Sequence, residues 1–489
     1  MINYLITLFL TPYITDEVGT EAYGFVSLAK NIAQYATYVT MALNSFATRF
    51  ISVEYHKKNI DKANVYFSST YYGDVVLGLG VFALSVLGIL NLNKIFNIPD
   101  GILKDVQILF LLVFIRFFIV TVASVNESGP MISNKLYLSG IYRLCSYLTE
   151  GTVLFILFHT FHANLFYVGA AMLAAALIEV FSNYWIRKKY TPELEIRKSS
   201  FRGSAVKELV GNGIWTSINS LGSFLHSGLD LTVCNLMLDS FQMGQLAISE
   251  TMSLMFKSIY TLVSTPFQPL LLKSYADGDT DGLIRQFKLS MKISSMLSNI
   301  CFAGVFALGL SYYRLWIPNQ DIDLIWKLTM ISIIACVTGG IVYPLYFSYT
   351  LTLRKKVPCM MTLISGAMNV ISMYFLIKYT SLGIYAVVWT TVVLTGALYL
   401  VAHPLYVSHV LNVRKYTFYP VILRCVVSCI ALTGIYYALS KLYMPKGWLS
   451  FFITAFAYAL IGAPIHVLLT FDARERGRVK EAVRKIIRK

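Results

Sequence analysis

Long apolar runs, separated by short charged or turn-rich segments, form the pattern of this chain from end to end. A membrane-spanning helix needs about 20 mostly apolar residues, because it rises about 1.5 Å per residue through a hydrocarbon core about 30 Å thick. Apolar runs occur at 2–14, 22–47, 65–90, 105–128, 137–161, 164–186, 209–236, 241–272, 289–313, 324–351, 359–378, 382–408, 418–440 and 448–470. The pattern predicts an all-α polytopic membrane protein with about 14 transmembrane helices.

The distribution of basic residues between the loops predicts the orientation of these helices. With the N-terminus placed in the cytoplasm, most of the 41 Lys and Arg residues fall in inner loops and in the C-terminal tail. Only a few fall in outer loops. Because basic loops are retained on the cytoplasmic side, this asymmetry supports an even number of helices and predicts that both termini are cytoplasmic.

Two short sequence similarities indicate an internal repeat. The pentapeptide GVFAL occurs at Gly80–Leu84 and again 224 positions later at Gly304–Leu308, and Tyr23–Lys30 resembles Met243–Glu250 at an offset of 220. Many transporters are duplicated in this way. The repeat predicts two six-helix lobes in a parallel pseudo-two-fold arrangement, with the chain divided into 1–186 (first lobe), 187–208 (basic cytoplasmic linker), 209–408 (second lobe), 409–470 (two further helices) and 471–489 (basic cytoplasmic tail).

The first apolar run, 2–14, is too short to cross a membrane. The repeat offers a reason, because the predicted helix 209–236 starts near Leu209 and its counterpart in the first half would start about eleven residues before Met1. We therefore expect helix 1 to be truncated in this sequence and the natural chain to start upstream of Met1.

Composition and charge narrow the classes of function. Apolar residues make up 56% of the chain and charged residues only 13%, about half the charged fraction of a typical soluble protein. The net charge of +16 is compatible with nucleic acid binding in principle. However, Lys and Arg form short clusters between apolar runs, and no zinc-finger, RRM or helix-turn-helix pattern occurs. Nucleic acid is therefore excluded as a partner.

The sequence contains no motif for catalysis or for a resident cofactor. The seven Cys residues lie in apolar runs without a CxxC motif or a Cys/His cluster, which is typical of buried thiols. The seven His residues form no HExxH motif, and no Ser/His/Asp arrangement stands out. We expect a protein that is not an enzyme and that uses no cofactor and no metal.

Three predicted helices, 22–47, 209–236 and 241–272, carry polar residues at steps of three and four, which places them on one helix face. Such faces either hydrogen-bond to neighbouring helices or line a hydrated cavity. Cations at membrane depth suit a pyrophosphate, because Arg binds it as a fork and Lys as a point charge. The candidate substrate-binding residues are Lys30, Arg116, Arg143 and Lys257, together with Gln34, Asn44 and Asn219.

Other charged residues of the apolar runs have alternative roles. Acidic residues at depth are candidates for ion pairs with these cations or for coupling to H⁺ or Na⁺, namely Glu150, Glu250, Asp230 and Asp74. Basic residues at the inner ends of two helices, Arg49 and Lys273, are candidates for an inner gate. Cations nearer the helix ends are expected to extend to lipid headgroups, namely Lys292, Lys327 and Arg424.

Several segments resemble a known transporter family. The N-terminal segments LFLTPYITDEVGTEAYGFVSLAKNI and SFATRFISVEYHKKNIDKAN, the later loop KSYADGDTDGL and the LWIP of Leu315–Pro318 are similar to the polysaccharide and O-antigen flippases. These belong to the multidrug/oligosaccharidyl-lipid/polysaccharide exporter superfamily. In that family pattern Gly24 marks the entry to helix 2 and Arg49 its cytoplasmic end, and both match here.

The resemblance implies a fourteen-helix transporter that works by alternating access around a central cavity. It further implies a substrate such as an O-antigen, capsule or exopolysaccharide repeat unit linked to polyprenyl pyrophosphate, and a location in the bacterial cytoplasmic membrane. The lipid bilayer, H⁺ or Na⁺ as a coupling ion and a glycan polymerase complex are the partners that it suggests.

Two other functions are kept as alternatives. A small-molecule or multidrug antiporter of the same superfamily is expected to favour acidic residues in its cavity, whereas Lys and Arg at least balance Asp and Glu here. A membrane glycan polymerase needs a sizeable outer loop to hold its acceptor. The outer loop that contains Asp321 and Asp323 is only about ten residues long, so a polymerase is the weaker alternative.

Overall fold

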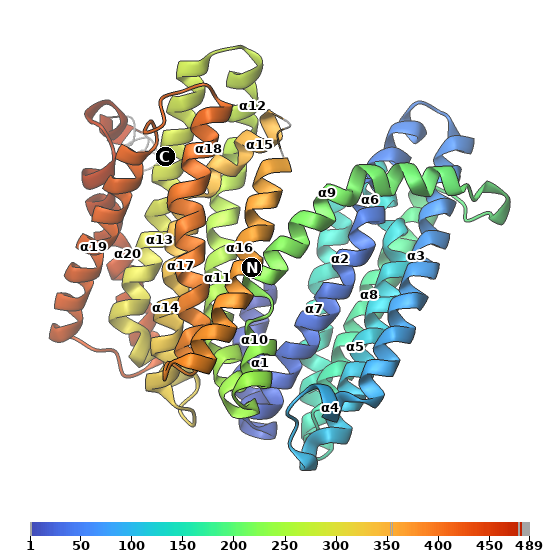
Figure 1. Ribbon diagram of the computed structural model, residues 1–489, viewed down its shortest axis with the longest axis horizontal. Helices are drawn as coiled ribbons and strands as arrows, with labels where there is room; N and C mark the ends of the chain where they lie inside the picture. The colour runs from blue at the N-terminus through green and yellow to red at the C-terminus, as the bar shows by residue number, and fades with distance from the viewer. Residues whose placement is uncertain (1, 353, 355, 478–479, 482–489) are drawn as a thin grey trace. The chain divides into compact units, whose positions relative to one another are not determined.

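The computed structural model describes residues 2–352, 354, 356–477 and 480–481, and the side chains of residues 2–7 are left undescribed. All regular elements among these residues are helices (Figure 1). The prediction of an all-α polytopic protein is therefore confirmed. By the density of its internal contacts, the chain separates into two compact units, Met1–Ala247 with Thr362–Val370, and Ile248–Met361 with Ile371–Lys489. The predicted boundaries at 186, 208, 408 and 470 stay predictions.

The first unit is built from long helices that are joined by short turns. Their bounds are α1 (Ile2–Val18), α2 (Thr20–His56), α3 (Ile60–Leu90), α4 (Leu92–Ile95), η1 (Asp100–Ile102), α5 (Leu103–Ala123), η2 (Ser124–Glu127), α6 (Ser128–Ile132), α7 (Leu136–Thr160), α8 (Phe166–Tyr190), η3 (Lys198–Ser200), α9 (Gly203–Ser227) and α10 (Asp230–Met237). Within this unit α2, α3, α5, α7 and α8 lie side by side, and α9 packs against α2 (Figure 1).

The second unit contains most of the remaining helices. Their bounds are α11 (Ser240–Ser264), η4 (Thr265–Phe267), α12 (Gln268–Ala276), α13 (Thr280–Trp316), α14 (Ile322–Val342), η5 (Tyr343–Tyr346), α15 (Phe347–Leu351), α16 (Lys356–Tyr379), α17 (Ile384–Ala397), η6 (Leu398–Ala402), α18 (His403–Val410), α19 (Tyr419–Leu442) and α20 (Trp448–Thr470). The apolar cores of this unit join α13 to α14, α19 and α20.

In the described part of the chain, ten helices are long and apolar enough to cross a membrane. The other four predicted spans coincide with α1, α2, α9 followed by α10, and α11 followed by α12. Three of these four carry the polar stripes found in the sequence, which lower their mean hydropathy. The number of fourteen spans therefore stays a prediction.

The helix bounds repeat along the chain. Helix α2 runs from Thr20 to His56, and α11 to α12 run from Ser240 to Ala276, so that both limits are 220 positions apart. Helices α3 and α13 likewise begin 220 positions apart. The series α5, η2 and α6 has 21, 4 and 5 residues, and the series α14, η5 and α15 has the same lengths. These equal spacings and lengths support the predicted internal repeat.

The structure also fixes the register of the repeat. The offset of 220 between Tyr23–Lys30 and Met243–Glu250 is the one that the helices follow. At this offset Gly80 corresponds to Ile300 and not to Gly304. The offset of 224 inferred from GVFAL is therefore wrong by about one helical turn, because similar apolar segments recur by chance in membrane helices.

The turns that open α3 and α13 have the same chemistry in both halves. The Asn59 side chain accepts a hydrogen bond from the backbone N–H of Lys62, and the Asp279 side chain accepts one from Gly282, at 2.8 Å in the second case. The residue before each cap has a positive φ, 62° at Lys58 and 69° at Gly278. Side-chain capping satisfies backbone donors that have no partner within the helix, so both helices begin at a defined residue.

Candidate functional site

Helix α2 presents two of the predicted substrate-binding residues on its exposed surface. Lys30 and Gln34 are one helical turn apart, and both are exposed. Lys30 lies ten residues inside α2 and makes no hydrogen bond or ion pair with the described residues. A lysine at this depth without a carboxylate partner is available to an anionic ligand.

Helix α9 carries an exposed polar stripe in the same unit. Asn212, Thr216, Asn219 and Ser223 recur at steps of four and three, and all four are exposed. Two of them bond to their own helix, Asn212 to the carbonyl of Glu208 and Ser223 to that of Asn219. Because no hydrogen bond joins these side chains to a neighbouring helix in the described part of the chain, the stripe is compatible with a hydrated surface.

Arg116 and Arg143 have different surroundings. Arg143 on α7 is bound by Glu179 on α8, with Nε and Oε1 2.9 Å apart. The partner weighed from the sequence, Glu150, forms no ion pair with Arg143 in the described part of the chain. Arg116 lies near the middle of α5, is half-buried, and makes neither a hydrogen bond nor an ion pair with the described residues.

Lys257 and Glu250 belong to the second unit. Both are half-buried on α11 and lie two turns apart along the helix. Lys257 lies close enough to Tyr399 and Cys336 for an electrostatic interaction. The candidate thus sits beside a group of aromatic residues within its own unit.

Asn44 and Asp74 are brought together by the packing of α2 on α3. The Asn44 Nδ2 atom donates to Asp74 Oδ1 at 2.8 Å, and Ser124 Oγ lies 3.2 Å from Asp74 Oδ2. Asn44 was predicted to bind substrate and Asp74 to couple an ion, and the sequence did not indicate that they are partners. The two residues are 30 positions apart in the chain, and only the packing of α2 on α3 brings them into contact.

The remaining candidates lie apart from these groups. Asp230 is buried in the first turn of α10, where a carboxylate is favoured by the helix dipole. Arg49 and Lys273 are both exposed, Arg49 about two turns before the end of α2 and Lys273 in the last turn of α12. Their role as an inner gate stays a prediction.

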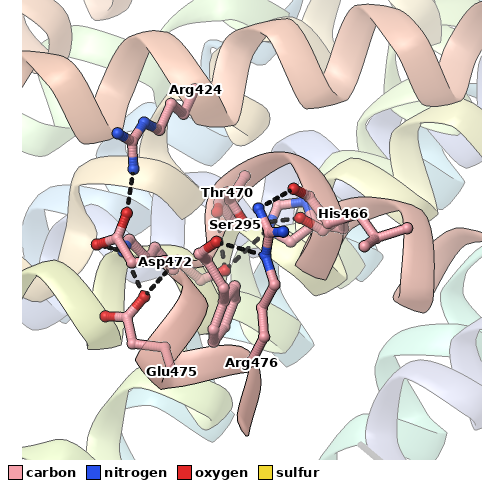
Figure 2. Close-up of polar contacts among 10 residues, drawn as sticks. Ser295, Arg424, His466, Thr470, Asp472, Glu475 and Arg476 are labelled. Atoms are coloured by element: carbon pink, nitrogen blue, oxygen red, sulfur yellow. Dashed lines mark hydrogen bonds and ion pairs between the residues drawn. The ribbon is translucent and has the colours of Figure 1, made fainter.

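The structure reveals one polar cluster that the sequence did not predict. Lys292 on α13 is only 2% exposed, and its Nζ lies 2.7 Å from Glu475 Oε2 and 3.4 Å from Asp472 Oδ2. Arg424 on α19 binds the other oxygen of Asp472 at 2.7 Å (Figure 2). The expectation that Lys292 reaches the headgroups is therefore wrong, because two carboxylates that follow α20 cover its ammonium.

His466 and Arg476 extend this cluster toward α20. His466 Nδ1 lies 2.9 Å from Ser428 Oγ, and its Nε2 lies 3.1 Å from the carbonyl of Lys292. Arg476 donates to the carbonyls of Phe471 and Leu468, which are left open where α20 ends (Figure 2). The cluster fastens the end of α20 to α13 and α19, and we call it the C-terminal anchor.

In the C-terminal anchor, removing the carboxylates and removing the buried lysine charge should have different effects on stability. Removing both carboxylates with Asp472→Asn and Glu475→Gln leaves the Lys292 charge buried without a partner, which is expected to destabilise the protein by about 3 kcal/mol. Lys292→Met keeps the volume and removes the charge, so we expect a much smaller change. Thermal unfolding in detergent checks this, and equal losses in the two variants would contradict the assignment.

The anchor also predicts a pH dependence. The hydrogen bond from Arg424 holds the pKa of Asp472 below its ordinary value of 3.8, and Lys292 adds to the effect. Because this folded-state pKa is depressed, the stabilisation is present above pH 4 and is lost as the pH falls through the folded value. Hydrogen exchange of the end of α20 should rise in this acidic range. Asp472→Asn should remove the dependence.

Among the described residues, no group of three or more His, Cys, Asp or Glu side chains is placed to hold a metal ion. The described cysteines are all free thiols, six of them buried or half-buried. The predicted site residues are therefore polar and cationic side chains on long helices, without a metal cluster among the described residues.

Comparison with known proteins finds a matching family and a membrane protein of similar sequence. A family profile described as "Polysaccharide biosynthesis protein" matches residues 1–274. The chain is 26% identical over 490 residues to "Uncharacterized membrane protein EpsK" of Bacillus subtilis (strain 168), an alignment that covers 99% of this chain and 96% of that protein.

Solved structures with a similar fold are transporters and flippases. An inward-facing multidrug resistance MATE family transporter of the MOP superfamily matches with a TM-score of 0.71 at 12% identity, over 84% of this chain and 96% of that one. The lipid II flippase MurJ, in an inward closed conformation, matches with a TM-score of 0.61 at 13% identity, over 96% of this chain and 99% of that one. The named functions are those of transporters and not of enzymes.

Proposed function

The chain belongs to the polysaccharide biosynthesis protein family, and on this premise we propose that it moves a polyprenyl-pyrophosphate-linked oligosaccharide across the bacterial cytoplasmic membrane by alternating access. The substrate is a repeat unit of an O-antigen, a capsule or an exopolysaccharide. Both termini lie in the cytoplasm in this proposal, and the polyprenyl chain stays in the lipid while the sugar and pyrophosphate cross.

The observation that carries the proposal is the presence of cations at membrane depth without a carboxylate partner. Lys30 and Arg116 make no ion pair with the described residues. An unpaired cation in a membrane helix is costly unless a ligand or water neutralises it. A pyrophosphate supplies the matching charge and accepts hydrogen bonds from both kinds of side chain.

Further candidates complete the proposed binding surface. Arg143 and Lys257 supply additional positive charge, and Gln34, Asn44 and Asn219 supply hydrogen bonds for sugar hydroxyls. Arg49 and Lys273 act at the inner gate. H⁺ or Na⁺ drives the cycle through one of the acidic residues at depth, and a glycan polymerase complex receives the product.

The relatives support a lipid-linked substrate and also keep one alternative open. MurJ is named a flippase for lipid II, which favours a lipid-linked headgroup for this chain. The TM-score of 0.71 to a multidrug resistance transporter favours a small-molecule antiporter as the second candidate. The two differ in the charge of the cargo, because a cationic cargo gains nothing from Lys30 and Arg116.

A deletion strain and a reconstituted assay test the proposal. Cells that lack this protein should accumulate the lipid-linked oligosaccharide in the inner leaflet, and the full chain in liposomes should move a fluorescent polyprenyl-pyrophosphate sugar between leaflets. Drug sensitivity without accumulation of lipid-linked sugar would establish the antiporter instead. A chain that moves neither kind of cargo would overturn both.

A further inference from the structure

Asp74 is a fully buried carboxylate in the middle of α3. It is 0% exposed, and its contacts come from two neutral side chains, Asn44 of α2 at 2.8 Å and Ser124 of η2 at 3.2 Å. Ser124 is the first residue after α5, at the point where the regular helix gives way to the tighter turn η2. Asp74 thus joins three elements of the first unit.

No described charged group neutralises this carboxylate. The elements packed against α3 are α2, α4, α5, α9, η2 and η3. The charged residues of these elements include Arg49, Lys94, Arg116, Glu127, Lys198 and Glu208, and none of these forms a hydrogen bond or ion pair with Asp74. Two of them act elsewhere, since Glu208 bonds to Tyr66 and Glu127 lies near Arg143 and Glu179.

Burial without a cation favours the protonated acid. An ionised carboxylate that loses its hydration is strongly destabilised, and two neutral hydrogen bonds recover only part of that loss. A protonated Asp74 keeps both contacts, because one oxygen still accepts from Asn44 and the other donates its proton to Ser124 Oγ. The geometry therefore suits the neutral acid without any rearrangement.

The internal repeat indicates that the fold itself does not need this carboxylate. At the offset of 220, Asn44 corresponds to Ser264 and Asp74 to Ser294. The two serines bind each other in the second unit, Oγ to Oγ at 3.0 Å, and both are fully buried. The same helix pair is therefore joined by two hydroxyls in one half and by an acid and an amide in the other.

A proton fits this site better than a sodium ion. The Asn44 amide turns its Nδ2 donor toward Asp74, so that an N–H group and not an oxygen ligand faces the place where a metal would bind. Hard cations such as sodium prefer several oxygen ligands, and the contacts of Asp74 supply one further oxygen, that of Ser124. Thr70, one turn earlier on α3, is also buried, and its Oγ1 has no hydrogen-bond partner among the described residues.

We propose that Asp74 is a proton-binding site of the first unit, and that release of its proton alters the junction between α5 and η2. An ionised Asp74 accepts from Asn44 and Ser124, but no described cation offsets its lost hydration. Ser124 lies at an irregular turn, where the backbone can move to admit water. The site stands on its own geometry. Its link to transport rests on the proposed function, where it identifies the coupling ion as H⁺.

Infrared difference spectroscopy of the purified full chain in nanodiscs tests the proton site without any substrate. The wild type should have a protonated-carboxyl band at neutral pH that Asp74→Asn removes. Glu150→Gln, which neutralises another carboxylate of the first unit, should leave the band unchanged. A band that survives in Asp74→Asn, or one that sodium removes at constant pH, would overturn the proton site.

Two further variants keep the test decisive if Asp74→Asn does not fold. Ser124→Ala retains the carboxyl but removes its hydrogen-bond partner, so the band should move to the higher frequency of a free acid. Asp74→Ser copies the residue at the corresponding position of the second unit and is expected to fold. A band that is unchanged in both variants would contradict the assignment.

The transport link is tested separately in liposomes with an imposed pH gradient. Asp74→Asn should lose at least tenfold of the gradient-driven movement of the fluorescent polyprenyl-pyrophosphate sugar while basal exchange persists. Gradient-driven movement that is equal in the wild type and the variant would overturn coupling through Asp74. If the wild type keeps the infrared band but moves no lipid-linked sugar, the proposed function fails and the proton site stands.

Discussion

Replacing Lys30, Arg116, Arg143 and Lys257 together by Gln is expected to abolish translocation of the lipid-linked oligosaccharide. Each cation that binds the pyrophosphate contributes about 1.5–3 kcal/mol through charge-assisted hydrogen bonds, so their losses multiply. Gln keeps a polar side chain of similar length and leaves the apolar runs intact. Membrane insertion should therefore be unchanged, and flipping in liposomes measures the loss.

Single substitutions should not be equal. Lys30→Gln and Arg116→Gln remove cations that form no ion pair with the described residues, and each should reduce transport about tenfold or more. Arg143→Gln should have a smaller effect on substrate binding, because Glu179 already neutralises its charge at 2.9 Å. This order follows from the structure, since the sequence assigns the same role to all of these cations.

A matched control uses cations outside the proposed site. Lys378 and Lys441 lie at the ends of α16 and α19, and each lies over a tyrosine ring. Lys378→Gln and Lys441→Gln should leave transport unchanged. Normal transport by the fourfold variant, or equal losses in the controls, would remove the cationic candidates from the substrate path.

Gly213→Ala is expected to disrupt the packing of α9 on α2. A Cβ atom at Gly213 would lie 2.0 Å from the carbonyl oxygen of Ala42 and 2.7 Å from Ser45 Oγ. The first neighbour is backbone and cannot rotate away, so one of the two helices must move. Overpacking of this kind costs about 1–3 kcal/mol, and the loss should appear as a lower unfolding temperature in detergent.

The same helix provides the control for this prediction. Gly211 lies two residues earlier on α9, and a Cβ there meets nothing within 4 Å. Gly211→Ala should be neutral or stabilising, by up to about 1 kcal/mol, because Ala restricts the unfolded chain and favours the helix. Equal stability of the two variants would contradict the close approach of α9 and α2.

The repeat illustrates how far local sequence similarity reaches. The all-helical membrane architecture followed from the apolar runs, and the duplication followed from two short sequence similarities. The helix bounds bear out the offset of 220. The offset from GVFAL was wrong because the match lies wholly in lipid-compatible residues, for which many registers are similar. The lengths of α5, η2 and α6, repeated in α14, η5 and α15, provide the register that sequence identity does not.

For the candidate site, the sequence identified the charged residues, but only the structure shows their partners. Position within the predicted membrane helices identified Lys30, Arg116, Arg143 and Lys257 as candidates. In the structure Arg143 pairs with Glu179, whereas Lys30 and Arg116 form no ion pair among the described residues. Lys292 was expected at the headgroups and is buried under Asp472 and Glu475 instead. Its partners lie 180 and 183 residues away in the chain, beyond the reach of any helix periodicity.

The sequence by itself determined which segments are helical, which faces are polar and that the chain is duplicated. These properties depend on the solvation of each residue by lipid or water, which is read along a single helix. Only the tertiary structure decided which charges are neutralised and which acid is buried among neutral groups, as Asp74 is between Asn44 and Ser124. Such pairings depend on how helices pack side by side, and that packing brings together residues that no local pattern connects.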